Sequence, residues 1–310
     1  MPLTDLQIQR AATGDLDALC DLDARGLIPA PGESAESYAG RLERLRTDLA
    51  EMETELAQTA EVKIEQFRFA AASRIPENVF GEAHAQTEQL FAFRADWVPG
   101  FYVSPRFSWL FGGCAYSFHP DLFTVFIIRH SFAAKDKWFL YSRRELLAHE
   151  LSHVARTSID STRFEERFAY MTGETGFRRH IGGAFHQPSD VFLMLGTLFL
   201  LLGAQMTQLS LLPGLPIWPF WIITLGFITH LAVRHIQDGK RLERALNRLR
   251  ATFGENARPA LFRCTDAEVV ELAALPADSA LAPWLAARTA DLRWRIIAKR
   301  FTPVPADSVS

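Results

Sequence analysis

The strongest constraint on the fold is a long segment without charge. From Val191 to Val233 the chain contains no Asp, Glu, Lys or Arg over 43 residues. One transmembrane helix needs about 20 apolar residues, so this segment is long enough for two. A Pro-Gly-x-Pro sequence at 213–216 interrupts it. The segment therefore predicts a helical hairpin with helices near 191–211 and 217–234.

Basic residues flank both ends of the predicted hairpin. Arg178 and Arg179 precede the first helix, Arg234, Lys240 and Arg241 follow the second, and the connecting turn is uncharged. Basic residues collect on the cytoplasmic side of membranes. We therefore expect an integral membrane protein, of the kind found in a bacterial inner membrane, with the bilayer as a partner and both termini in the cytoplasm.

The second constraint is the sequence His149-Glu150-Leu151-Ser152-His153, which reads HExxH. With 9 His and 36 acidic residues in 310, chance would produce His-acid-x-x-His about 3 times in 100. On a helix, His149 and His153 lie on one face and can bind one Zn²⁺. Glu150 is rotated by about 100°, so it can reach a zinc-bound water without binding the ion.

The local sequence favours a helix at this motif. Ser142 and Glu145 have the spacing of a capping box. Residues 142–157 contain no Gly or Pro, and Leu147 and Leu151 provide an apolar face. We expect a capped amphipathic helix with the site on the same side of the membrane as the termini.

A zinc hydrolase needs a third protein ligand and an open position. The metzincin pattern is excluded, because Arg156 and Ile159 stand where it requires Gly and His. Asp160 is one remaining candidate. Glu165 and Glu166, in a second predicted helix, are the others.

The second helix contains Glu166-Arg167-Phe168-Ala169. HExxH followed by a helical E-x-x-A resembles the gluzincin branch of the zincin metallopeptidases. The resemblance implies a zincin-like domain in which His149, His153 and Glu166 bind zinc. It also implies that the small residue at 169 lets the two helices pack closely. Where the membrane-anchored members have an Asp, this chain has Tyr170, which could hydrogen-bond a ligand or donate to an oxyanion.

The leading functional prediction is a membrane-anchored zinc metallopeptidase that hydrolyses protein or peptide substrates at the cytoplasmic face. Glu150 would activate the zinc-bound water, and Tyr170 is the candidate oxyanion donor. The alternative from another class is a catalytically inactive zincin-like scaffold or regulator that binds protein partners. A structural zinc site is a third reading, although such sites usually have four ligands and several Cys. Cys114 is the cysteine that could approach the motif.

The predicted fold class is α+β, with four parts. They are a helical region at 1–62, a zincin-like domain at 63–188, the hairpin at 189–234, and a C-terminal part at 235–310. This last part comprises a basic helix at 235–250 near lipid headgroups, a helical unit with a capping box at Thr265, and a disordered tail. Strands are expected at Phe67–Ala71, Phe101–Val103, Cys114–Phe118 and Phe123–Arg129. The resemblance to zincins also implies that an edge strand near the HExxH helix binds extended substrate, and Phe123–Arg129 lies just before that helix.

Two further expectations concern partners. The net charge of −3 gives no basic field for nucleic acid. Leucines and a methionine from Leu42 to Leu56 repeat at coiled-coil spacing, so the N-terminal helices could join two copies or pack as an antiparallel pair. Three scattered cysteines predict a reducing compartment without disulfides.

Overall fold

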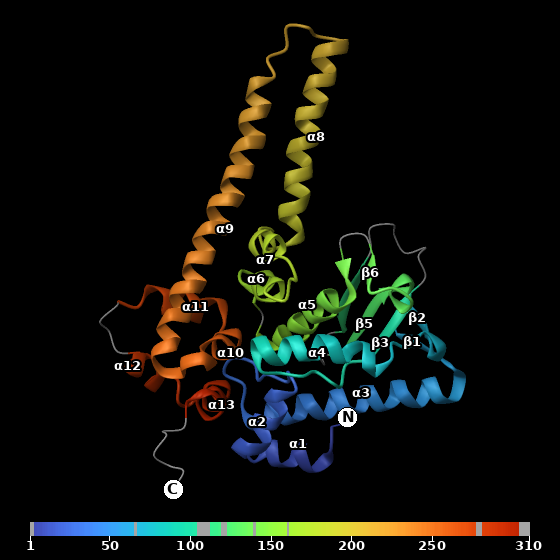
Figure 1. Cartoon of the computed structure of the whole chain (residues 1–310), viewed down its shortest axis with the longest axis vertical. Coiled ribbons are helices and arrows are strands. Elements are labelled where there is room, and N and C mark those ends of the chain that lie inside the picture. The colour runs from blue at the N-terminus through green and yellow to red at the C-terminus, as the bar shows by residue number, and fades with distance from the viewer. Residues whose placement is uncertain are drawn as a thin grey trace.

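The chain folds into a mixed α and β body from which two long helices project (Figure 1). This computed structural model describes residues 3–64, 67–103, 112–118, 123–138, 141–159, 161–276 and 281–303. The predicted α+β class is confirmed, with helices predominating. Of the predicted disordered tail, residues 304–310 lie outside the described residues.

The helices are α1 (Asp5–Ala12), α2 (Leu16–Ala24), α3 (Ala35–Thr59), α4 (Glu77–Phe91), α5 (Arg143–Arg156), α6 (Glu165–Tyr170), α7 (Gly176–Ile181), α8 (Pro188–Ser210), α9 (Trp218–Phe253), α10 (Ala257–Phe262), α11 (Asp266–Ala274), α12 (Leu281–Ala286) and α13 (Leu292–Phe301). The strands are β1 (Glu61–Ile64), β2 (Phe67–Ala70), β3 (Gly100–Val103), β4 (Gly113–Phe118), β5 (Phe123–Arg129), β6 (Lys137–Trp138) and β7 (Tyr141–Ser142). All four predicted strands are present.

Helices α8 and α9 form the predicted hairpin and rise away from the body (Figure 1). Both are long and apolar enough to cross a membrane, and the most apolar stretches are only 17% and 11% buried. Large side chains such as Phe192, Phe199 and Ile222 face outward instead. Exposed apolar surface of this extent is unusual for a soluble protein, which favours a lipid environment for this pair.

The second half of α9 leaves the hairpin and enters the body (Figure 1). Leu242, Ala245, Leu249 and Phe253 are buried where α9 packs against α10 and α11. The predicted helix at 235–250 is confirmed as part of α9, and its position near lipid headgroups stays a prediction for its basic face. Its amphipathic pattern reflects packing within the protein.

The central sheet has the order β3-β5-β4, with β3 parallel and β4 antiparallel to β5. Residues 123–128 of β5 are all buried, and β5 is paired on both sides, so this strand has no free edge for an extended substrate. Among the described residues β4 forms one edge of this sheet. Helix α5 packs against β4 and against α4, so β4 lies beside the helix that carries the HExxH sequence.

Helix α5 begins where the sequence predicts, but its cap differs. Ser142 is the N-cap residue and makes no capping hydrogen bond. Its hydroxyl donates instead to Glu174, at 2.9 Å, and Glu145 pairs with Arg178, at 2.8 Å. The predicted capping box is therefore wrong, because both side chains bind the segment that follows α6.

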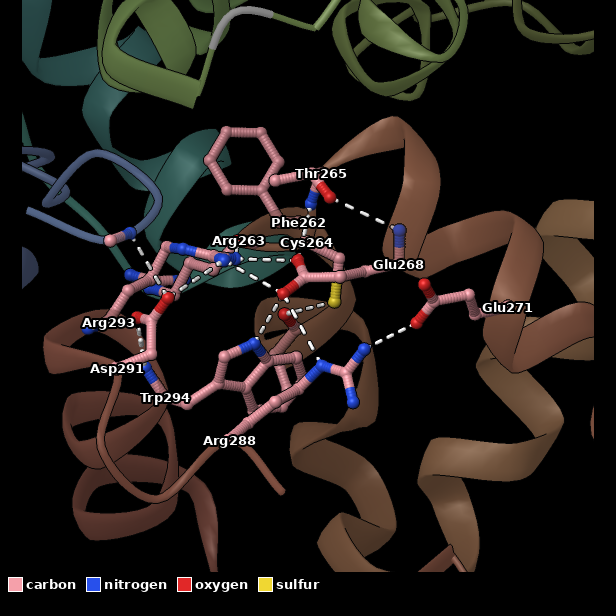
Figure 2. A network of polar contacts seen from close by, with 12 residues as sticks. Phe262, Arg263, Cys264, Thr265, Glu268, Glu271, Arg288, Asp291, Arg293 and Trp294 are labelled. Carbon is pink, nitrogen blue, oxygen red and sulfur yellow. Dashed lines mark hydrogen bonds and ion pairs between the residues drawn. The ribbon is translucent and has the colours of Figure 1, made fainter. Parts of the chain in front are cut away.

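A polar network connects the helices of the C-terminal unit (Figure 2). Thr265 and Glu268 form the predicted capping box of α11. The Glu268 carboxylate also accepts hydrogen bonds from Arg293, at 2.8 Å, and from the indole of Trp294, at 2.6 Å. Buried charge of this kind is stable only when it is paired, so the network holds α13 against α11.

The N-terminal helices pack within the chain. In α3, Leu42, Leu45, Met52 and Leu56 are buried where this helix contacts α1 and β1. The predicted seam therefore has its partners in the same chain. One hydrophobic core extends from Leu3 to Phe301 and, among the described residues, contains none from α8.

Candidate metal centre

The HExxH helix directs two imidazoles at one point. His149 and His153 lie one turn apart on α5, and their Nε2 atoms are 3.1 Å apart. Both side chains are mostly covered, with 15% and 23% of their surface exposed. At this distance the lone pairs of two unprotonated ring nitrogens would repel each other, so the pair is stable only when a proton or a metal cation lies between them.

Glu166 of α6 is the third member of the cluster. One of its carboxylate oxygens is 3.6 Å from His149 Nε2 and the other is 3.6 Å from His153 Nε2. One ligand atom from each of the three residues lies within 4.8 Å of the others. Ligands of tetrahedral zinc, each roughly 2.0–2.1 Å from the ion, are about 3.3 Å apart. The three residues therefore fit a zinc ion.

Glu165 has a different role from its neighbour. It accepts a hydrogen bond from His153 Nδ1, at 3.0 Å, which leaves Nε2 of the neutral ring free to bind a metal. Its second oxygen accepts from Arg156 Nε, at 2.7 Å. A carboxylate behind a ligating imidazole fixes the ring and its tautomer. The backbone of Ala169 likewise hydrogen-bonds the His149 imidazole.

Arg156 is a site residue that the sequence reasoning did not identify. Its side chain is fully buried, lies over the Phe168 ring at 4.4 Å, and donates to the carbonyls of Phe262 and Cys264. It follows His149 by seven residues, two helical turns along the same face. That spacing is the signal that could have revealed it.

Glu150 is positioned by the sheet. The backbone N–H of Ala115, in β4, donates to Glu150 Oε2 at 2.9 Å. Glu150 lines the same hollow as the three metal-site residues, with a volume of about 480 Å³. Burial raises the pKa of Glu150, although His153 and the Ala115 N–H oppose the rise. A carboxylate with a raised pKa is a stronger base.

The position of α6 depends on distant parts of the chain. Asp266 accepts hydrogen bonds from the backbone N–H groups of Thr162 and Arg163, at 2.9 and 2.8 Å, just before α6 begins. Arg163 also pairs with the buried Asp238 of α9, at 2.6 Å. Arg167 donates to the His235 carbonyl of α9. Helix α6 is therefore clamped both to α11 and to the foot of the hairpin (Figure 1).

The remaining residues near the site are placed as follows. The Tyr170 ring meets the His149 ring edge to face, with centroids 4.6 Å apart. His186 lines the hollow and its Nε2 lies 3.4 Å from Asp238. The His180 side chain is exposed. Asp160 lies outside the described residues.

A structural zinc site receives no support from the cysteines of the described part of the chain. The cluster there consists of two His and one Glu. Burial, with a smaller contribution from Glu150, raises the pKa of the Cys114 thiol to about 11. A protonated thiol is a poor zinc ligand, because the thiolate is the form that binds. Three ligands and an open position are the pattern of a catalytic site.

The two imidazoles differ in protonation. Burial and the neighbouring His153 lower the pKa of His149 well below its usual value. Burial also opposes protonation of His153, but the hydrogen bond to Glu165 and the charges of Glu150 and Glu166 outweigh it and raise its pKa to about 9. At neutral pH in the metal-free protein, His153 is therefore the charged imidazolium and His149 the neutral imidazole.

Zinc affinity is expected to rise with pH for this reason. A zinc ion would have to displace one proton from the His153 imidazolium, whose pKa is about 9. Affinity should therefore increase about tenfold for each pH unit below that value and level off above it. Competition with a chelator of known affinity at several pH values measures the slope. If zinc affinity does not change across a test range of about pH 6.5 to 8.5, the raised pKa of His153 is contradicted.

Comparison with protein-family models, with curated proteins and with solved structures finds no match to this chain. The function of the site is therefore inferred from its own geometry and chemistry.

Proposed function

We propose that this protein is a membrane-anchored zinc metallopeptidase with a zincin-like catalytic domain. The observation that carries the proposal is Glu150 beside the His149, His153 and Glu166 cluster. Three ligands leave a position open, as zinc hydrolases require, and a base lies in the same hollow. These are the parts needed to hydrolyse a peptide bond.

Each residue has a chemical task in this reaction. Zinc bound by the cluster would polarise the scissile carbonyl and acidify a water molecule. Glu150 takes the proton of the attacking water on its free oxygen, because Ala115 holds the other, and passes it to the leaving amine. Burial and the charge of Glu166 raise the pKa of Tyr170, so its phenol stays protonated, and we assign it as the donor to the developing oxyanion because its ring lies beside His149.

The edge strand β4 is the proposed binding surface for the substrate backbone. In an antiparallel strand the N–H and C=O of one residue point to the same side. The Ala115 N–H points toward Glu150 and away from β5, so the Ala115 carbonyl also faces the site. An extended peptide can pair with this edge and present a peptide bond to Glu150.

The hairpin α8–α9 is proposed to cross the membrane with the site and both termini on the cytoplasmic side. Its apolar faces are exposed, and its basic flanks join the body rather than the tip. Helices α1 and α13, the first and last helices of the chain, lie in the body, at the end of the molecule away from the tip (Figure 1). One side of the membrane therefore accommodates the whole body.

The proposal is tested with the full chain purified in detergent. We expect about one zinc per chain, and cleavage of a random-sequence peptide mixture detected as new amino termini. A chelator should stop cleavage and added zinc should restore it. Protein that binds zinc without any cleavage, or protein that binds no zinc, would favour an inactive scaffold instead.

A further inference from the structure

A second cavity adjoins the metal centre on the side of the hairpin. It has a volume of about 700 Å³ and is formed by α6, α7, the segment 182–187 and the start of α8. Glu166 of the metal cluster forms part of its wall. His186, Gln187 and Pro188 line both this cavity and the hollow of the metal centre. The two spaces therefore share a wall.

The cavity is apolar and continuous with the hairpin surface. Its lining includes Phe177, Ile181 and Phe185, which are 71%, 51% and 39% exposed. The next exposed apolar residues along the chain are Val191, also in the lining, and Phe192, both in α8. An apolar strip therefore extends from the wall of the metal centre to the helix that is proposed to enter the bilayer.

Two glycines shape the cavity wall. At Gly182 an added Cβ would lie 2.1 Å from Cγ of Tyr170, so the backbone lies flat against that ring. Gly183 has a positive φ of 75°, which favours glycine, and packs against Arg167. Arg234 of α9 donates to the Ala184 carbonyl, at 3.2 Å. The wall is therefore held between the ligand helix α6 and the hairpin.

We propose that this cavity binds the apolar residue next to a transmembrane helix of the substrate. This inference rests on the proposed function and names the substrate class as juxtamembrane segments of membrane proteins. A peptide that leaves β4 through the metal centre toward the cavity emerges at the foot of α8, where lipid would begin. Apolar substrate side chains just outside the bilayer can enter the cavity and so remain shielded from water. Each side chain buried in this way strengthens binding.

The test uses the full-length Glu150→Gln protein in vesicles of phosphatidylethanolamine and phosphatidylglycerol. The probe is a polyleucine helix of about 20 residues followed directly by photo-leucine and a tail of Ala and Ser. A second probe consists of the photo-leucine tail without the helix. We expect the anchored probe to crosslink to residues between 177 and 191, and the tail alone to give about tenfold less product.

Variants then test the cavity itself. Phe185→Asp and Phe177→Asp place a charge on exposed lining residues, so folding is expected to survive and crosslinking to fall about tenfold. Leu6→Asp is the matched control, because Leu6 is 65% exposed and lies on α1, outside the cavity lining. Equal crosslinking by both probes, crosslinks confined to the outer faces of the hairpin, or unchanged yield in both cavity variants would overturn the inference.

Crosslinking does not require hydrolysis, so the two proposals fail separately. Zinc-loaded wild-type protein is incubated with the anchored probe in parallel. Crosslinking in the cavity without cleavage contradicts the peptidase and retains the cavity as a binding site for such segments. Cleavage of the anchored probe without crosslinks in the cavity contradicts the cavity as the binding site and leaves the proposed peptidase activity standing.

Discussion

Glu150→Gln is expected to abolish most hydrolysis while zinc stays bound. Glu150 Oε2 accepts a hydrogen bond from the Ala115 N–H, at 2.9 Å. The amide oxygen of Gln can accept the same bond, so the side chain should keep its place. An amide cannot take a proton from water, and losing a general base lowers rates by roughly 10²–10⁴-fold. The loss should appear in the turnover rate, since neither the β4 edge nor the metal cluster is altered.

The matched control is Glu82→Gln, which makes the same chemical change at an exposed position of α4. Zinc content is measured by atomic absorption and cleavage with the random-sequence peptide mixture. Both variants should contain as much zinc as the wild type. Glu150→Gln protein with zinc bound and full activity would exclude Glu150 as the base.

Much of the fold is visible in the sequence because it depends on local patterns. The uncharged segment and its central prolines predict α8 and α9, and β-branched and aromatic residues predict β2 to β5. Helix α4 was missed, since its surroundings are rich in strand-forming residues. Its buried positions, such as Phe80, Ala83 and Thr87, follow helical spacing. The hairpin helix near 217–234 and the basic helix at 235–250 together match α9, but the sequence does not show that the second half packs against α11.

The metal centre shows where local pattern stops being sufficient. The spacing of His149 and His153 places both on one face of α5, as observed. Adjacent glutamates on a helix differ by about 100° in direction, so the choice between Glu165 and Glu166 depends on how α6 is turned. Asp266, more than 100 residues away, holds the segment before α6, and local spacing cannot reveal such a contact.

Alanine substitutions at the two glutamates should have different effects. Glu166→Ala removes a proposed ligand. Binding energies of about 10–16 kcal/mol for four-ligand zinc sites imply a loss of roughly 10²–10³-fold in affinity for one ligand. Burial and the nearby Glu165 already raise the pKa of Glu166, so the metal-free protein should lose little stability.

Glu165→Ala should instead act mainly on the metal-free protein. It leaves the fully buried Arg156 without its carboxylate, and removing one partner of a buried pair costs about 3–5 kcal/mol. Zinc affinity should fall by about 10–100-fold, because His153 loses the group that orients it. Denaturant unfolding of the metal-free variants and chelator competition measure the two effects. Zinc loss confined to Glu165→Ala, with Glu166→Ala unaffected, would reverse the assignment of ligand and supporting carboxylate.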